Sequence, residues 1–593
     1  MLFGKHLNRY YLRYAGVLLL GLVSLILVDY AQLTIPNLYQ MVINGMNDGM
    51  VFSDGQWYVF DMDFLLDRIC RPMIFIILIL VLGRFLWRIC FFGSAIRVET
   101  DLRNRMFRHS KDLSRQYYQV NKVGNLMSLY TNDLDTVQEC FGSGILMLCD
   151  AVFLGGMALF KMFKMDATLT GLSLIPIACL LAASIIVGKH MMRKWDIRQA
   201  AFSDLSDFSQ ESFSGIAVIK AFVKETKELL AFKKLNQQNE KANVDYTKIS
   251  VLMRICVTLF VESVICVILG YGGYLVWCDK FNAGQLVEFI GYFNTVIWPA
   301  MAVSELIEMS SRGKASLKRI SELLDAKQDV VDRPDVRPAD RLTGKIEFRN
   351  LTFRYPDGEY DALSNVSFTI EAGENVGLVG KTGAGKTTLV DLILRTYNVP
   401  DGTIFIDGHD VNTLPIRQVR EASAYVPQDN FLFSDTIENN IAFSGAREPA
   451  AVEAAARLAD VHGNISEFKE GYQTVLGERG VTVSGGQKQR ISIARALMKD
   501  APILILDDSV SAVDTKTEKV ILENLRNTRK GRTTILIAHR VSTIERMDKI
   551  LFIDDGKLLA VGTHEHLYQT CLDYRRMVDL QKLEDEGGEH NNA

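Results

Sequence analysis

The chain has 593 residues, about four times the size of a common domain, so we expect two or more folding units. Hydrophobic residues make up 48% of the chain and charged residues 23%, and the mean hydropathy is +0.09. These values exclude a disordered chain and suggest one apolar part and one polar part. The 66 basic and 70 acidic residues give a net charge of -4, which offers no argument for nucleic-acid binding. Nine scattered cysteines without CxxC spacing predict neither a disulfide framework nor a zinc site.

The first apolar stretch covers residues 15–28 and continues to about residue 40. It exceeds the roughly 20 residues that a helix needs to cross about 30 Å of hydrocarbon. Basic residues precede it, as in a signal peptide, but no small-x-small cleavage site follows and further apolar stretches do. We therefore predict a bundle of six membrane helices near residues 15–40, 70–95, 143–163, 167–188, 255–278 and 283–308.

The charges of the connecting loops predict the orientation of this bundle. Residues 41–67 carry five aspartates and no Lys or Arg, whereas residues 97–122 carry seven basic residues. By the positive-inside rule, both termini and the loops 96–142 and 189–250 are expected in the cytoplasm, with the bundle in the cytoplasmic membrane. Each long loop is predicted to be a helical hairpin that extends from the membrane, whereas the external links at 164–166 and 279–282 are very short.

The second half of the chain has a different pattern. We assign residues 1–320 to the membrane domain, 321–344 to a linker rich in Asp, Arg and Pro, and 345–583 to a second domain. Its apolar runs are of strand length (376–380, 501–506, 533–538) and alternate with mixed helical segments, which is typical of an α/β fold with a buried parallel sheet. The polar tail 584–593 is predicted to be disordered.

A phosphate-binding loop follows the first of these strands. The stretch GKTGAGKTT at 380–388 matches GxxxxGK[ST] and precedes an apolar helical run. Glycines let the backbone N–H groups face phosphate oxygens, Lys386 would neutralise the β- and γ-phosphates, and the Thr387 hydroxyl would hold Mg²⁺. Asp507 ends a buried strand further on, where a second contact to Mg²⁺ is needed. ATP and Mg²⁺ are therefore the predicted cofactors.

Three further features carry a resemblance to a known family. They are VSGGQKQR (483–490), SAVD (511–514) and His539. Together with the phosphate-binding loop they resemble the nucleotide-binding domain of an ABC transporter, and the six preceding spans resemble a multidrug-exporter-type (type IV) half-transporter. The stretches 124–139 and 211–225 are also similar to cytoplasmic loops of that family. The resemblance covers essentially the whole chain and implies a six-helix all-α membrane domain followed by an α/β P-loop ATPase domain.

The resemblance also implies roles for single residues. Tyr355 would stack on adenine, Gln428 would touch Mg²⁺ or the attacking water, and His539 would contact the γ-phosphate. The stretch Glu478, Arg479 and Gly480 resembles the segment that contacts the coupling helices. The implied nucleotide-binding residues are Tyr355, Gly380, Lys381, Thr382, Gly383, Ala384, Gly385, Lys386, Thr387 and Thr388, with Ser484, Gly485, Gly486 and Gln487 closing over nucleotide on the opposite subunit. The implied Mg²⁺ ligands are Thr387, Gln428 and Asp507. The implied catalytic residues are Asp508, His539 and Gln428.

One position departs from the family pattern. Where the family has a glutamate as general base immediately after the strand-end aspartate, this chain has Asp508. Aspartate is shorter by one methylene, so hydrolysis at this chain's own ATP site is expected to be weak. The intact signature 483–487 would then complete a competent site on a partner, as in the degenerate-site subunit of a heterodimeric exporter. The alternative is that Asp508 acts as a slower base in a symmetric homodimer.

The expected function is ATP-driven efflux of amphipathic small molecules by alternating access, with a second half-transporter as partner. Acids in or near the spans would favour amphipathic cations if they face a cavity, but inter-helix structural roles explain them equally well. They are Asp29, Asp150, Glu262 and Glu305. A lipid or peptide exporter, a siderophore importer on the exporter fold and an ATP-gated channel or regulator remain alternatives.

Overall fold

The computed structural model describes residues 4–53, 55–445, 448–477, 480 and 482–590, which form two compact units. The first unit runs to Ser110 and resumes over Gly124–Asp325. The second unit contains Lys111–Val123 and the chain from Ala326 onward. The border at Asp325 lies inside the linker predicted for 321–344, because the last helix of the first unit continues past residue 320.

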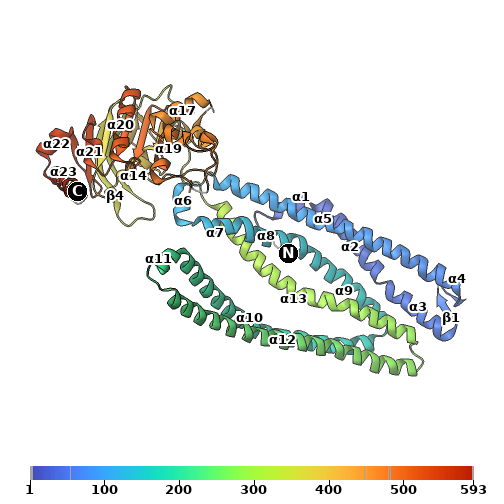
Figure 1. Cartoon of the computed structure of the whole chain (residues 1–593). Helices are drawn as coiled ribbons and strands as arrows, with labels where there is room; N and C mark the ends of the chain where they lie inside the picture. The colour runs from blue at the N-terminus through green and yellow to red at the C-terminus, as the bar shows by residue number, and fades with distance from the viewer. Residues whose placement is uncertain (1–3, 54, 446–447, 478–479, 481, 591–593) are drawn as a thin grey trace. The chain divides into compact units, whose positions relative to one another are not determined.

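The first unit is a helical bundle (Figure 1). Within the described residues, six helical segments are long and apolar enough to cross a membrane, which confirms the six predicted spans. Each predicted span lies within one segment, apart from Cys278, which immediately follows α12 (Glu225–Trp277). A continuous apolar run satisfies its backbone hydrogen bonds most simply as a helix. The main helices are α2 (Ala15–Gln32) with α3 (Ile35–Asp48), α5 (Arg71–Ser110), α9 (Ile145–Met165), α10 (Ala167–Ser214), α12 (Glu225–Trp277) and α13 (Ala283–Asp325).

Shorter elements connect these helices. A hairpin of two antiparallel strands lies between α3 and α5, in the acidic loop, and the sequence did not indicate it because each strand has only four residues. In the segment that leads into α9, short α-helices alternate with π-helical turns at 129–133 and 140–144. The short elements are α1 (Asn8–Arg13), β1 (Met50–Ser53), β2 (Gln56–Val59), α4 (Met62–Phe64), α7 (Val123–Ser128) and α8 (Leu134–Glu139), with a π-helical turn at Leu65–Cys70.

Helices α10 and α12 run side by side and are joined by the short helix α11 (Ile216–Ala221) (Figure 1). This confirms the helical hairpin predicted for 189–250. Only 6% of the most apolar stretch of α10 and 11% of that of α12 are buried within the chain. The two helices therefore present most of their apolar surface to something other than this chain, namely lipid or another protein.

The second unit contains a six-stranded sheet in the order β12-β11-β5-β10-β9-β8. All neighbouring pairs are parallel except the edge pair of β11 and β12. The three predicted strands are the adjacent central strands β5, β10 and β9, which confirms the α/β assignment. The strands are β5 (Asn375–Val379), β8 (Ser423–Val426), β9 (Ile503–Asp507), β10 (Thr533–Ile537), β11 (Lys549–Asp554) and β12 (Lys557–Gly562).

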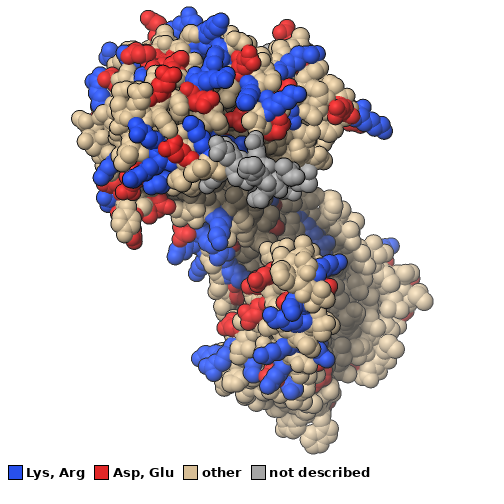
Figure 2. Space-filling view, turned by 60° about the vertical axis from the view of Figure 1, so that its left-hand side comes forward, with Lys and Arg blue, Asp and Glu red and all other residues tan. Residues whose placement is uncertain are grey.

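A second, antiparallel sheet in the order β4-β3-β6-β7 packs its apolar residues against those of the first sheet and α14. Its strands are β3 (Ile346–Arg354), β4 (Asp361–Ile370), β6 (Ile404–Ile406) and β7 (His409–Asp410). Figure 2 shows Lys and Arg side chains interspersed with Asp and Glu side chains on the surface of this unit. Two large buried clusters, one of them formed by residues of β3–β6 and α14, make up its core.

The helices of the second unit surround these sheets. The last of them, α23, extends to His590, into the tail 584–593 for which the sequence predicted disorder. Good helix formers at 581–586 continue its pattern. The helices are α6 (Arg115–Val120), α14 (Lys386–Ile393), α15 (Ile416–Glu421), α16 (Ile437–Ile441), α17 (Pro449–Leu458), α18 (His462–Ser466), α19 (Gly485–Met498), α20 (Thr515–Thr528), α21 (Val541–Ile544), α22 (His564–Thr570) and α23 (Leu572–His590).

Candidate functional site

The carboxyl ends of four neighbouring parallel strands meet at one edge of the six-stranded sheet. Strand β5 leads into the loop 380–385, β9 ends in Asp507, β10 precedes His539 and β8 precedes Gln428. These segments line a pocket of about 290 Å³, in the place where open α/β sheets bind ligands. Its lining includes Tyr355, Thr382, Gly383, Gly385, Lys386, Thr387, Thr388, Gln428, Asp507, Asp508 and His539.

The phosphate-binding loop has the backbone that its glycines predict. Gly385 has a φ of 97°, and a Cβ atom there would lie 2.8 Å from the carbonyl oxygen of Ala362. A larger residue would therefore be strained at this position. Lys386, the first residue of α14, is buried and donates hydrogen bonds to the carbonyls of Gly380 (2.8 Å) and Lys381 (2.9 Å). Burial lowers the pKa of Lys386, so a phosphate nearby would favour its charged form.

Asp507 lies at the floor of this pocket and is only 1% exposed. Burial raises its pKa, while a hydrogen bond with Thr387 and the charge of Lys386 oppose that rise. A carboxylate, a hydroxyl and the nearby amide of Gln428 are oxygen ligands of the kind that Mg²⁺ prefers. Such a set fits a Mg²⁺ ion that takes its remaining ligands from phosphate oxygens and water.

Asp508 is held in an uncommon backbone conformation, with a φ of 47°. Its carboxylate is 4.0 Å from Nε2 of His539, measured from Oδ2, and its carbonyl accepts a hydrogen bond from the hydroxyl of Ser511 (2.9 Å). Both side chains line the pocket. The structure thus brings together an acid and an imidazole beside the lysine of the phosphate-binding loop.

His539 owes its position to a residue that the motifs did not reveal. Gln581, on α23, donates to the carbonyl of His539 (2.7 Å) and accepts from the backbone N–H of Val541 (2.8 Å). Its side chain therefore fixes the loop on both sides of Arg540. A glutamine about forty residues away in sequence gives no local signal for this contact.

Tyr355 follows β3 and lies at one side of the pocket. Its hydroxyl is hydrogen-bonded to that of Thr388 (2.8 Å), and its ring meets those of Phe353 and Tyr397 edge to face at 5.2 and 5.1 Å. The half-buried ring is thus fixed by its neighbours and still forms part of the pocket wall.

The signature residues 484–487 do not line this pocket. They form the start of α19, where Ser484 and Gln487 cap the helix: the Ser484 hydroxyl accepts from the Gln487 backbone (3.3 Å), and the Gln487 side chain accepts from the Ser484 backbone (2.9 Å). Gln489 then joins α19 to the segment after β9 by accepting from the backbone of Ala512 (2.9 Å). Glu478 and Arg479, assigned to the coupling contact, lie outside the described residues.

Comparisons with known proteins agree with these two units. Residues 18–300 match the family described as ABC transporter transmembrane region, and residues 363–511 match the family described as ABC transporter. The chain belongs to the ABC transporter family. It is 36% identical over 591 residues to the probable multidrug resistance ABC transporter ATP-binding/permease protein YheI of Bacillus subtilis (strain 168), covering 99% of this chain and 98% of that protein.

Other ABC transporters show the same extent of similarity. The multidrug resistance-like ATP-binding protein MdlA of Escherichia coli (strain K12) is 34% identical, over 98% of this chain and 96% of MdlA. An ATP-dependent lipid A-core flippase of Syntrophus aciditrophicus (strain SB) is 34% identical, over 89% of each chain. The solved structure of a bacterial Atm1-family ABC exporter with ATP bound has a TM-score of 0.75 and 25% identity, and covers 97% of this chain and 98% of that one. This ABC transporter therefore has the exporter fold, spans a membrane and binds ATP.

In this ABC transporter, the short helix α6 packs on α14 within the ATP-binding unit. Arg115, on α6, donates to Asp391 on α14 (2.7 Å), and the Tyr397 hydroxyl donates to the side chain of Gln119 (2.7 Å). Asp391 is only 4% exposed and lies about one and a half helical turns after Lys386, the lysine of the phosphate-binding loop. Burial raises the pKa of Asp391, and Arg115 opposes that rise. The motifs gave no signal for this pair because its partners are 276 residues apart.

The variant Arg115→Gln is expected to destabilise the transporter by about 1 kcal/mol, between the values for exposed and buried ion pairs, since Arg115 is half exposed. Asp391 already has a pKa above its unfolded value, and losing Arg115 raises it further. Because the buried carboxylate is unfavourable only when ionised, the loss should grow as pH rises. Melting temperatures of the purified transporter should differ more at pH 8 than at pH 5.5. The matched double variant Arg115→Gln/Asp391→Asn should recover most of the loss; an equal loss at both pH values would refute the explanation.

The acids of the membrane unit have different surroundings. Asp29, on α2, is buried, and its carboxyl lies within hydrogen-bond reach of Asp150 on α9. The indole of Trp298, on α13, donates to Asp150 (2.9 Å). Glu262 and Glu305 are exposed. Of the four acids singled out in the sequence, the structure therefore brings two together, with a tryptophan from a third helix.

Proposed function

We propose that this ABC transporter is one half of a dimeric exporter that drives amphipathic small molecules out of the cell, with a weakly hydrolysing ATP site on this chain. One observation carries the proposal. The phosphate-binding loop, Asp507 and Asp508 share a pocket that the signature residues 484–487 do not reach. Each chain would thus supply half of each ATP site, so that two chains are needed to complete one.

Residues of the pocket would divide the recognition of ATP among them. Tyr355 would carry the adenine on its ring face, the backbone N–H groups of 380–385 would surround the phosphates, and Lys386 would exchange its bonds to loop carbonyls for phosphate oxygens. Thr387, Gln428 and Asp507 would hold Mg²⁺, which neutralises the developing charge on the phosphates when bound. His539 would donate a hydrogen bond to the γ-phosphate.

Asp508 would serve as the base for the attacking water, and its short side chain supports slow hydrolysis. A glutamate at this place would reach about one C–C bond further toward the γ-phosphate, and a misplacement of about 1 Å can cost on the order of 10²-fold in rate. The site on this chain would then mainly clamp ATP. The intact signature at the start of α19 would direct its backbone N–H groups and helix dipole at nucleotide on the partner.

The partner is proposed to be a different half-transporter that carries the glutamate. The exposed α10 and α12 offer a surface for a second chain, together with Val218 of the linking helix α11 and Phe222 just after it, which are 62% and 68% exposed. A homodimer in which Asp508 acts twice is the second candidate. In either assembly ATP would close the two ATP-binding units, and hydrolysis at the competent site would permit reopening, which gives alternating access.

We infer that the transporter lies in the cytoplasmic membrane with both termini in the cytoplasm. The support is the asymmetry of charge: seven basic residues in 97–122 against none in the acidic loop 41–67. Export of substrates is supported by the similarity to proteins named as multidrug transporters.

The substrate class is proposed to be amphipathic cations, recognised through the buried Asp29 and the partly exposed Asp150. A carboxylate held among membrane helices is costly without a partner, so a cationic substrate nearby would be favoured. The variant Asp150→Asn should lower export of a cationic dye about 10-fold while leaving export of a neutral dye of similar size unchanged. Glu262→Gln, at an exposed acid of α12, is the matched control. Equal loss of both dyes, or loss in the control, would argue against this role.

The function is tested by purifying the tagged chain from its own cell together with any bound half-transporter, and then assaying a substrate panel in liposomes. The proposal expects a second chain in the complex and ATP-dependent movement of cationic amphiphiles to the side away from the ATP-binding units. A lipid is the second candidate substrate, favoured by the similarity to a lipid A-core flippase. Movement of labelled lipid without movement of any dye would select it.

A further inference from the structure

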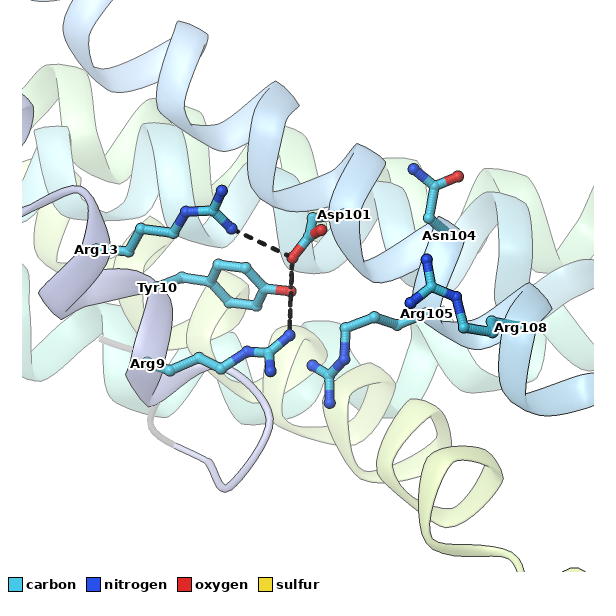
Figure 3. Close-up of a pocket in the computed structure, with 7 residues that line it drawn as sticks. All are labelled: Arg9, Tyr10, Arg13, Asp101, Asn104, Arg105 and Arg108. Carbon is cyan, nitrogen blue, oxygen red and sulfur yellow. Dashed lines mark hydrogen bonds and ion pairs between the residues drawn. The ribbon is translucent and has the colours of Figure 1, made fainter.

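A basic pocket of about 480 Å³ lies in the first unit, and the residues that line it are far in sequence from those of the ATP site. Two elements form it: α1, just before the first span, and the part of α5 beyond its apolar stretch (Figure 3). Its side chains point toward one another from the two helices. They include Arg9, Tyr10 and Arg13 of α1 and Asp101, Arg105 and Arg108 of α5.

The charges in this pocket do not balance. Among the described residues that line it, Asp101 is the only acid. It accepts a hydrogen bond from the buried Tyr10 hydroxyl (2.5 Å) and lies 3.7 Å from Arg9 and 3.8 Å from Arg13. The Nη2 atom of Arg105 donates a hydrogen bond to Nδ1 of His6 (3.3 Å). The Nη1 atom of Arg105 is buried and has no hydrogen-bond partner among the described residues. With Arg108, four guanidinium groups thus line the pocket, and only those of Arg9 and Arg13 lie near the Asp101 carboxylate, so an anion would supply the missing charge.

The packing of α2 against α5 places the pocket at the edge of the membrane. Gly21 packs on Cys90, and Ser24 donates to the carbonyl of Gly83 (3.0 Å), so the two helices run antiparallel. The same register brings Tyr10 to Asp101. It also places the start of the apolar stretch of α2, at residue 15, opposite the start of the basic stretch of α5, at residue 97. The pocket therefore begins where the apolar parts of both helices end, at the level of lipid headgroups.

We propose that this pocket binds a phosphate group, and that the group belongs to an anionic lipid of the leaflet on the basic side. Guanidinium groups bind phosphate oxygens in pairs, and basic pockets between membrane helices at this level select anionic headgroups. Arg9 and Arg13 are 53% and 63% exposed, so a headgroup can reach them from the side. Leu19 and Leu20, which follow the pocket residues in sequence on α2, are also exposed, as contact with an acyl chain requires. This lipid is a bound ligand and is distinct from the transported substrate.

The test measures lipid binding to the purified, delipidated full-length transporter by native mass spectrometry, with phosphatidylglycerol and phosphatidylcholine of identical acyl chains as probes. The wild-type transporter is expected to prefer phosphatidylglycerol. In Arg9→Gln/Arg13→Gln the preference should fall roughly 25-fold, about 5-fold for each arginine near the membrane surface. Both arginines are exposed, so their replacement leaves the packing of the helices intact.

Lys189→Gln/Arg193→Gln is the matched control, because these two exposed cations are also four residues apart and follow the apolar part of α10. It should keep the preference of the wild type. An absent preference in the wild type, or an equal fall in the control, would overturn the proposal. A second arm adds inorganic phosphate at millimolar concentration: unchanged phosphatidylglycerol binding supports the lipid source, and full displacement would assign the pocket to a soluble phosphate instead.

Discussion

Replacing Asp508 by glutamate is expected to raise hydrolysis at this chain's own ATP site on the order of 10- to 100-fold. The added methylene moves the carboxylate toward the place of the attacking water, and a base misplaced by about 1 Å loses on the order of 10²-fold. The backbone at 508 has a φ of 47°, a conformation that aspartate adopts more readily than glutamate, so the gain should fall below the full factor. His539, 4.0 Å away, and Asp507 are unchanged by the substitution.

The effect is measured as the steady-state ATPase activity of the purified complex. In this complex the partner carries glutamine in place of its own general base, the glutamate that follows the strand-end aspartate. In that background the remaining activity reports the site on this chain. Asp508→Asn is the matched control and should not raise turnover, because it removes the base while keeping the size of the side chain. Unchanged turnover in Asp508→Glu would count against a degenerate site.

A second large effect is expected at the signature. A Cβ atom on Gly485 would meet open space, with no heavy atom within 4 Å, so Gly485→Asp should fold normally. In the assembled complex its carboxylate would face the phosphates bound to the partner, where like charges repel strongly. We expect a loss of ATPase activity of at least about 100-fold, comparable to removing an electrostatic contact to the transition state.

The comparison with Lys386→Ala makes this prediction specific. Lys386 lies in the ATP pocket of this chain, so its loss should weaken ATP binding there and lower turnover of the complex by less than about 10-fold. Gly485→Asp should leave that binding unchanged. The binding of a fluorescent ATP analogue and the ATPase activity are measured on both variants. These two measurements separate the loss of ATP binding at this chain's pocket from the loss of turnover. Equal losses of turnover in the two variants would indicate two equivalent sites.

Much of the fold followed from the sequence because its signals are local. Six long apolar runs became the six spans, and three short apolar runs became the central strands β5, β9 and β10. The hairpin of β1 and β2 was not predicted, since each of its strands has only four residues. The antiparallel sheet was also not predicted, although β3 and β4 largely alternate buried and exposed residues, because its other strands, β6 and β7, have only three and two residues. The helix α13 passes residue 320 because the linker composition begins only after Asp325.

The candidate site was predicted in part for the same reason. The residues from the strand ends, including Lys386, Asp507 and His539, share one pocket because the motifs mark where buried parallel strands stop. Gln581, which fixes the loop of His539, and Arg115, which pairs with Asp391, could not be predicted. Their contacts depend on how distant elements pack, and a glutamine or arginine in a helix carries no sign of its partner.

We propose that the two ATP sites of the complex differ and that this chain holds the site that mainly binds ATP without hydrolysing it. The most direct measurement is photolabelling of the purified complex with azido-ATP radiolabelled at the α-phosphate, after a single turnover, with separation of the two chains. We expect triphosphate on this chain, in the pocket of Tyr355 and Lys386, and diphosphate on its partner. Diphosphate in equal amounts on both chains, or a complex made only of this chain, would contradict it.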